Sequence, residues 1–234
     1  MGHEIAIAEY VMGALIALRR GFIDVDAGMR RGEWRGGFLG PGDVYEELYG
    51  SRLGLIGYGR IGARVHTLAA TFEMRCGAVT LHPGRLRNAA PALDTIGDIG
   101  QAADVDALVA WADALVICCE LSPITEGLID RRRLSLMKET ALLINVARGA
   151  IAVEADLYEA LRDRRIAGAA IDVWYKYPER SGENSTPSRL DFSALDNVLM
   201  TPHCSGWTRG FKGRRLAWLA NAIADFRRQR QREA

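Results

Sequence analysis

The sequence has few cysteines and no long apolar run. Its four cysteines include no CxxC pair and no Cys/His cluster at zinc spacing, so it predicts neither a disulfide framework nor a metal site. No stretch of about 18 uninterrupted apolar residues is present, so we predict no transmembrane helix. The N-terminus carries Glu4 and Glu9 and lacks the basic stretch and apolar run of a secretory signal. We therefore expect a cytoplasmic protein that does not use a membrane as a partner.

An excess of charge of either sign is also missing. Thirty Lys and Arg residues oppose 29 Asp and Glu residues, which leaves a net charge of +1. Such a chain has no overall attraction to DNA or RNA, so we do not expect nucleic acid as a partner. The sequence does provide core material, because 49% of its 234 residues are hydrophobic. That length fits one large α/β domain, or one domain with a fragment of a second.

Short apolar runs alternate with helical patterns along most of the chain. The strand-like runs lie at residues 52–56, 74–81, 114–118, 141–146 and 167–173. Helical spacing of apolar residues occurs at residues 4–20, 61–72, 105–111, 130–137, 153–163 and 216–228. Short runs that are apolar throughout are typical of a parallel sheet covered on both faces. The predicted fold is therefore a doubly wound parallel α/β sheet of the Rossmann type, with long flanking helices.

Glycines follow the first predicted strand in a pattern that predicts a nucleotide site. The chain there reads Gly57-Tyr58-Gly59-Arg60-Ile61-Gly62 and then continues as a helix. In such a fingerprint Gly57 allows a tight turn, Gly59 lets a pyrophosphate approach the backbone, and Gly62 permits close packing of the helix. The N–H groups of the helix N-terminus would face the phosphates. We predict that residues 57–62 bind a dinucleotide; the alternative is a purely structural turn.

The next predicted strand leaves the choice between NAD and NADP open. An NAD-binding strand normally ends in an acidic residue that accepts a hydrogen bond from the ribose, about 20 residues after the fingerprint begins. Here Thr80 offers only a hydroxyl, while Arg85 and Arg87 follow closely enough to meet a 2′-phosphate. This favours NADP, unless the arginines are solvated and the pyrophosphate carries the binding. We therefore predict NAD or NADP, with Thr80 and Arg85 as candidate contacts.

Five motifs in this order resemble those of the D-isomer-specific 2-hydroxyacid dehydrogenase family. They are residues 53–62 (LGLIGYGRIG), 121–129 (LSPITEGLI), 145–149 (NVARG), 168–174 (GAAIDVW) and 201–203 (TPH). The resemblance covers nearly the whole chain from Glu4 onward. It implies a leading helix with an expected dimer contact at residues 1–35 and an NAD(P)-binding domain at 36–205. Residues 206–234 would form a C-terminal helix that is a remnant of the substrate domain.

The resemblance also implies roles for individual residues. Reduction of a 2-keto acid requires a cation that holds the carboxylate and polarises the carbonyl, and an acid/base that exchanges the hydroxyl proton. By resemblance Arg148 is that cation, His203 is the general acid/base, and Asp172 contacts the nicotinamide carboxamide. The resemblance further assigns cofactor contacts to Val146, Ala147 and Gly206.

The sequence departs from the family pattern in two places. The family's catalytic acid, which pairs with the histidine, stands five residues after the aspartate, and here that residue is Tyr177. Glu179 follows two residues later, past a proline. We expect a slower or altered reaction, with Tyr177 as the candidate catalytic residue unless Glu179 takes over. We also expect most of the substrate domain to be absent, which would leave the cleft without one wall.

Two hypotheses of different classes follow from these residues. The first is an NAD(P)-dependent oxidoreductase acting on the CH–OH group of a small D-2-hydroxy acid, assembled as a homodimer through the helix at residues 4–20. The apolar stripe of that helix could instead cover the chain's own sheet. The second is a catalytically inactive NAD(P)-binding module that dimerises or binds a partner. A formate- or phosphite-oxidising relative is a third possibility that the segment 174–178 does not favour.

Overall fold

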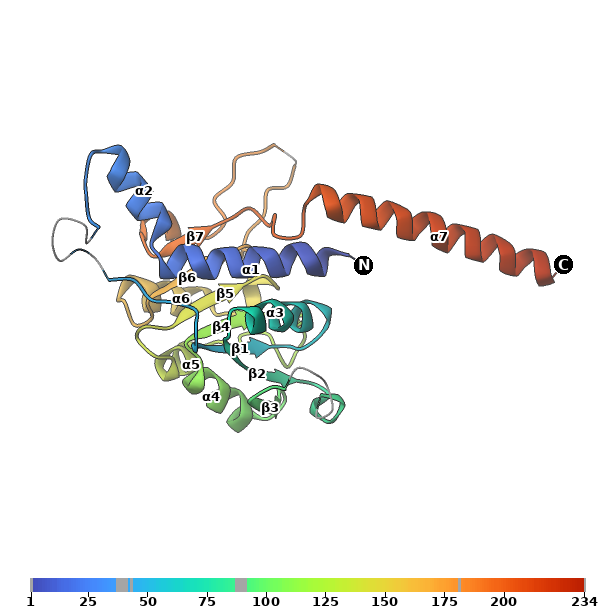
Figure 1. Cartoon of the computed structure of the whole chain (residues 1–234), viewed down its shortest axis with the longest axis horizontal. Helices are drawn as coiled ribbons and strands as arrows, with labels where there is room; N and C mark the ends of the chain where they lie inside the picture. The colour runs from blue at the N-terminus through green and yellow to red at the C-terminus, as the bar shows by residue number, and fades with distance from the viewer. Residues whose placement is uncertain (1, 37–41, 43, 87–91, 181, 234) are drawn as a thin grey trace.

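A parallel sheet of seven strands forms the centre of the computed structural model, which describes residues 2–36, 42, 44–86, 92–180 and 182–233. The strands lie in the order β3-β2-β1-β4-β5-β6-β7 (Figure 1). Their bounds are β1 Arg52–Ile56, β2 Arg75–Thr80, β3 Thr95–Asp98, β4 Ala114–Ile117, β5 Leu142–Asn145, β6 Gly168–Ile171 and β7 Val198–Met200. The order reverses between β1 and β4, and in such sheets a ligand crevice opens at the carboxyl ends of the strands at that point.

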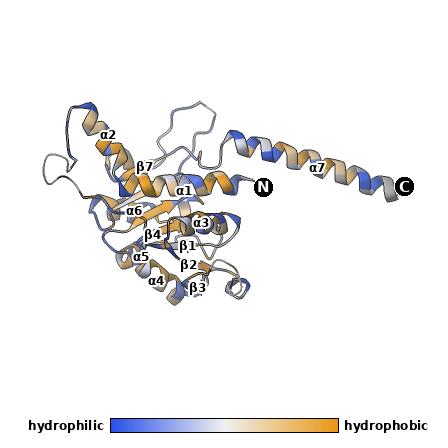
Figure 2. Cartoon of the chain, viewed as in Figure 1, coloured by the Kyte–Doolittle hydropathy of each residue, from blue (hydrophilic) through white to orange (hydrophobic). Residues whose placement is uncertain are grey.

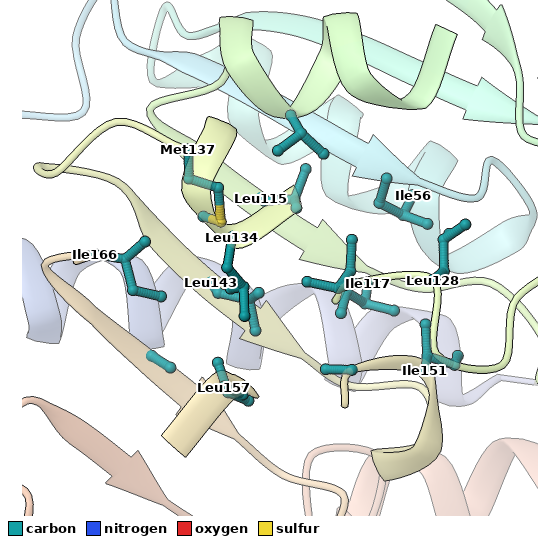
Figure 3. Packing of buried hydrophobic residues seen from close by; sticks show 14 of the residues in the cluster. Ile56, Leu115, Ile117, Leu128, Leu134, Met137, Leu143, Ile151, Leu157 and Ile166 are labelled. Atoms are coloured by element: carbon teal, nitrogen blue, oxygen red, sulfur yellow. The ribbon is translucent and has the colours of Figure 1, made fainter. Parts of the chain in front are cut away.

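Helices cover both faces of this sheet, which confirms the predicted doubly wound fold. The helices are α1 His3–Arg19, α2 Phe22–Arg30, α3 Arg60–Thr71, α4 Ala102–Trp111, α5 Arg131–Leu136, α6 Glu154–Arg162 and α7 Arg209–Glu233. One core lies between the sheet and α1 and α3, and includes Leu15, Leu55 and Val65. The second lies on the other face, under α4, α5 and α6, where Ile117, Leu143 and Leu157 pack together (Figure 3).

The apolar stripe of α1 covers the chain's own sheet. Ala8, Val11 and Leu15 have no exposed surface, and α1 packs on α3, β5 and β6. Of the two interpretations left open by the sequence, the intramolecular one therefore accounts for this stripe. Exposed apolar side chains of the N-terminal region include Phe22, Ile23 and Met29 of α2, each about half exposed, and Trp34 after that helix.

Four elements differ from the sequence-based predictions. Helix α2 was not predicted, because it has nine residues and buries only Gly28. Strands β3 and β7, at the two edges of the sheet, were not predicted, because both are short and only partly buried. Helix α7 begins at Arg209, seven residues before the predicted start. It extends away from the body of the molecule (Figure 1), and apolar and polar residues alternate along it (Figure 2). No helix in the described part of the chain is long and apolar enough to cross a membrane.

Candidate active site

The glycines of the fingerprint form a tight turn between β1 and α3. Gly57 has φ +101°, and a Cβ added there would lie 2.8 Å from the backbone of Cys119. A Cβ at Gly62 would lie 2.6 Å from the carbonyl oxygen of Gly57. Both positions therefore require glycine for packing within the chain.

Gly59 differs from the other two glycines because nothing in the described chain crowds it. A Cβ there would meet no atom within 4 Å. Gly59 is the N-cap of α3, and no side chain caps this helix. The free N–H groups and the positive end of the helix dipole thus face open space, which is the arrangement that binds a phosphate.

The other fingerprint side chains point in different directions. The Tyr58 hydroxyl lies 2.7 Å from Nδ1 of His66, so this side chain packs on α3. Burial raises the pKa of Tyr58 and lowers that of His66. Arg60 is exposed at the start of α3, and Ile61 lines a cavity beside this helix. The Tyr58 side chain itself is only half-buried.

The end of β2 offers a hydroxyl and an exposed cation. Thr80 is half-buried and pairs in register with Asp98 of β3. The Asp98 carboxylate accepts a hydrogen bond from the amide of Gly100 at 2.8 Å. Arg85 is exposed at the end of the short 3-10 turn Pro83–Arg85, and its guanidinium makes no ion pair with the described residues. Arg87 lies outside the described residues.

A cavity of about 770 Å³ opens beside the fingerprint helix. Six residues predicted from the sequence line it: Ile61, Val146, Ala147, Arg148, His203 and Gly206. Thr80, Arg85, Asp172, Tyr177 and the remaining fingerprint residues lie outside its lining. The cavity therefore joins the start of α3 to the two residues expected to bind substrate and move a proton.

Arg148 reaches this cavity from the turn after β5. The side chain of Asn145 shapes the turn, donating to the Arg148 carbonyl oxygen at 3.0 Å and accepting from the Ala147 amide at 3.1 Å. Gly149 permits close packing, because a Cβ there would lie 2.6 Å from the Trp174 carbonyl oxygen. The Arg148 side chain is exposed, so its guanidinium can meet an anion that enters the cavity.

His203 projects from a strained turn and has Tyr177 as its partner. Its φ of +56° lies in the left-handed region, which non-glycine residues adopt infrequently. The Tyr177 hydroxyl lies 3.1 Å from Nδ1 of His203 and accepts a hydrogen bond from the Trp174 amide, also at 3.1 Å. The structure thus brings Tyr177, and not Glu179, to the histidine.

Asp172 lies at the end of β6, fully buried and outside the cavity. Its carboxylate accepts hydrogen bonds from the chain itself, namely from the Thr201 hydroxyl and the amides of Cys204 and Ser205. Because no surface of Asp172 is exposed, a nicotinamide carboxamide can reach it only if the turn at residues 203–205 shifts.

Several lining residues were not identified from the sequence. Cys118, Cys119 and Glu120 follow β4, and their position after a buried strand at the switch point is a signal that could have found them. Burial raises the pKa of Cys119 to about 11, so this thiol stays protonated near neutral pH. Phe211 and Arg215 reach the cavity from α7. No sequence signal gives the direction in which that helix leaves the body. The described residues include no cluster of His, Cys, Asp or Glu suited to a metal ion.

Comparison with known proteins links this geometry to a family. The family described as "D-isomer specific 2-hydroxyacid dehydrogenase, NAD binding domain" matches residues 12–205. A D-3-phosphoglycerate dehydrogenase of Methanocaldococcus jannaschii is 35% identical over 201 residues, which is 86% of this chain and 35% of that protein. The chain spans between about a third and a half of the length of the first curated relatives that it matches.

Two solved structures resemble the whole chain closely. An acyclic imino acid reductase in complex with NADPH and D-Arg is 25% identical, with a TM-score of 0.79 over 98% of this chain and 67% of that one. The NAD-dependent formate dehydrogenase from Staphylococcus aureus in complex with NAD is 28% identical, with a TM-score of 0.77 over 96% of this chain and 62% of that one.

Proposed function

The chain belongs to the family of D-isomer specific 2-hydroxyacid dehydrogenases, by its NAD-binding domain, and from this premise we propose that it transfers a hydride between NAD or NADP and a small D-2-hydroxy acid. One observation carries the proposal: Arg148 and His203, from turns 55 residues apart in sequence, line a single cavity. A cation and an acid/base are what the reaction requires of the protein. The same cavity reaches Ile61 in the first turn of α3.

The first turn of α3 fits the pyrophosphate of a dinucleotide. The space beside Gly59 and the uncapped N–H groups support this assignment. The bound nicotinamide would supply the hydride for reduction of the keto acid, or accept it in the reverse reaction. We propose that the cofactor is held by residues 57–62, by Thr80 and Arg85 near the adenosine ribose, and by Val146, Ala147 and Gly206 beside the cavity. The predicted contact of Asp172 with the carboxamide would require the turn at residues 203–205 to shift, since Asp172 is fully buried.

The substrate is held and protonated by the chain's own residues. Arg148 binds the carboxylate and polarises the carbonyl group of the keto acid. His203 donates a proton from Nε2 to the carbonyl oxygen as negative charge develops there, and takes the proton back in the oxidation direction. Tyr177 fixes the orientation of the imidazole through Nδ1, because its hydroxyl lies at hydrogen-bonding distance.

A hydroxyl at position 177 makes this pair different from a carboxylate–histidine pair. A carboxylate can only accept from Nδ1–H, and its negative charge stabilises the imidazolium. The Tyr177 hydroxyl can either donate or accept, and it carries no charge. We therefore expect a slower proton transfer and a less strictly defined tautomer of His203 than a carboxylate would give.

We further propose a homodimer formed through residues 1–35. The apolar side chains available for it include Phe22, Ile23 and Met29 on α2 and Trp34 after that helix, since the stripe of α1 is already buried against the sheet. Light scattering at micromolar concentration tests the assembly, and a monomeric mass would contradict it.

A fluorescence titration of the whole chain with NADH and NADPH tests the proposed function. Glyoxylate, hydroxypyruvate and phenylpyruvate are then added in the same cuvette. We expect binding followed by keto-acid-dependent oxidation of the cofactor, and His203→Gln should abolish turnover while cofactor affinity stays within about twofold. Binding without turnover in the unmodified chain would contradict the proposed reaction and favour an inactive binding module. Absence of binding would contradict both.

A further inference from the structure

A chain of hydrogen bonds connects α1 to the turn that carries His203. The Tyr10 hydroxyl on α1 lies 2.8 Å from Oγ1 of Thr201, and Thr201 Oγ1 donates to Oδ1 of Asp172 at 2.6 Å. We propose that Tyr10 is a positioning residue for His203 and acts through Thr201 and Asp172. This inference rests on the proposed role of His203 as the acid/base.

The direction of these hydrogen bonds follows from the number of protons available. The Asp172 carboxylate accepts, so the single hydroxyl hydrogen of Thr201 is committed to Asp172. The Tyr10 hydroxyl must then be the donor to Thr201 Oγ1. Burial raises the pKa of Tyr10 to about 12, so the phenol keeps the hydrogen that it donates at any working pH.

Asp172 passes this connection to the catalytic turn. Its Oδ1 also accepts from the Cys204 amide at 2.8 Å, and its Oδ2 accepts from the Ser205 amide at 3.0 Å. These two residues directly follow His203. Hydrogen bonds to an ionised carboxylate are stronger than neutral ones, so Asp172 fixes the backbone on the C-terminal side of the histidine.

Thr201 holds the other side of the same turn. Its carbonyl oxygen accepts from the His203 amide at 3.1 Å and from Nε1 of Trp174 at 2.8 Å. Left-handed backbone at a non-glycine residue persists only where the surrounding contacts enforce it. The φ of +56° at His203 is enforced by Thr201 on one side and by Asp172 on the other.

Loss of the Tyr10 hydroxyl would release the side chain of Thr201. Thr201 Oγ1 would lose the hydrogen bond that it accepts and keep only the one that it donates to Asp172, so its side chain would be held less firmly. The imidazole would then sample positions away from the Tyr177 hydroxyl and from the substrate. A displacement of reacting groups on the order of 1 Å lowers turnover steeply, by up to about a hundredfold.

The test compares two tyrosine variants of the full chain. Tyr10→Phe removes the hydroxyl of the proposed connection, and Tyr175→Phe removes a partly buried hydroxyl that donates to the Ala152 carbonyl oxygen at 2.9 Å, outside the catalytic turn. We expect Tyr10→Phe to lower kcat by about ten- to hundredfold with less than about a twofold change in cofactor Kd. Tyr175→Phe should leave kcat unchanged at a comparable loss of Tm.

A nitrogen NMR spectrum of the imidazole rings gives a readout that does not need turnover. The chain has four histidines, and the signal of His203 is the one lost in His203→Gln. We expect Tyr10→Phe and Thr201→Val to move the Nδ1 resonance of His203 toward that of a free imidazole. Thr201→Ser, which keeps the hydroxyl, should show the same Nδ1 resonance of His203 as the unmodified protein.

Two results would overturn the inference. One is a His203 resonance and kcat that are unchanged in both Tyr10→Phe and Thr201→Val; the other is an equal change in Tyr175→Phe. If the unmodified chain bound cofactor but reduced no keto acid, the proposed function would fail. The imidazole resonances would still decide whether Tyr10 positions His203.

Discussion

Replacing single glycines of the fingerprint by alanine separates cofactor binding from folding. The Cβ of Gly59→Ala would enter space that no atom of the described chain occupies within 4 Å. The Cβ of Gly62→Ala would lie 2.6 Å from the carbonyl oxygen of Gly57. The first substitution should therefore disturb a bound phosphate, and the second the protein itself.

The expected magnitudes follow from these two environments. Alanine is a poorer N-cap than glycine, so Gly59→Ala should cost about 0.5 kcal/mol of unfolding free energy and lower Tm by about 1–2 °C. At Gly62 the close contact is with backbone, which cannot rotate away, and overpacking of this kind costs up to about 3 kcal/mol. The better helix propensity of alanine offsets up to about 1 kcal/mol of that cost. A net loss of about 2 kcal/mol corresponds to a fall in Tm of about 4–8 °C for a chain of this size.

The two variants should rank in the opposite order for cofactor affinity: Gly59→Ala, the milder change for stability, should be the more damaging one for cofactor binding. In Gly59→Ala the new methyl group would hold the pyrophosphate away from the N–H groups of α3, and we expect a rise in Kd for NADH of about ten- to hundredfold, or about 1.4–2.8 kcal/mol. Thermal unfolding and fluorescence titration of the same samples measure both quantities. An unchanged Kd in Gly59→Ala would refute the position assigned to the pyrophosphate. If Gly59→Ala lowered Tm as much as Gly62→Ala does, the argument that position 59 has room for a Cβ would be refuted.

Three further predictions follow from particular side chains. Thr80→Asp should raise the ratio of the NADPH Kd to the NADH Kd by about tenfold or more, because a carboxylate accepts from a ribose hydroxyl and repels a 2′-phosphate; paired titrations measure this ratio. Tyr177→Glu should increase keto-acid turnover, because a carboxylate stabilises the imidazolium beside it, and equal or lower turnover than in Tyr177→Phe would contradict this. Partial burial raises the pKa of Asp113, but hydrogen bonds from Lys138 and the Arg52 amide outweigh it and lower the pKa overall. A lowered pKa stabilises the fold above the ordinary value near 4, and this contribution is lost as the pH falls further. Urea unfolding between pH 3 and 7 should thus show a weaker acid dependence in Asp113→Asn.

The turn proposed to hold the cofactor could be predicted from the sequence because its determinants are local. The strand, the glycine turn and the first turn of α3 are consecutive in the chain. The requirement for Gly57 and Gly62 comes from contacts within that unit and with Cys118 and Cys119, which directly follow β4. Because this unit is local, spacing alone also showed that Thr80 stands near the position where an NAD-binding strand normally ends in an acidic residue.

The proposed catalytic half of the site could be predicted from the sequence only in part. Spacing from Asp172 pointed to Tyr177 as the candidate partner of His203, and the structure brings these two side chains together. The hydrogen bonds of Asp172 could not be predicted, because their donors lie about 30 residues away in a turn whose conformation depends on packing. Likewise, periodicity identified the apolar face of α1 but not the surface that this face covers.

Helix α1 supports the proposed catalytic half of the site at two separate points. Tyr10 connects it to the turn of His203. At its N-terminal end the Gly2 carbonyl oxygen accepts from Nε and Nη2 of Arg214, at 3.1 and 2.8 Å, and the ring of His3 contacts Phe211 edge-on. These contacts hold the start of α7, which supplies one wall of the cavity. The contacts of Gly57 and Gly62 that fix the fingerprint turn involve no residue of α1. Helix α1 nevertheless packs on α3, whose first turn is proposed to hold the pyrophosphate. A change that shifts α1 along the sheet should therefore lower both turnover and cofactor affinity.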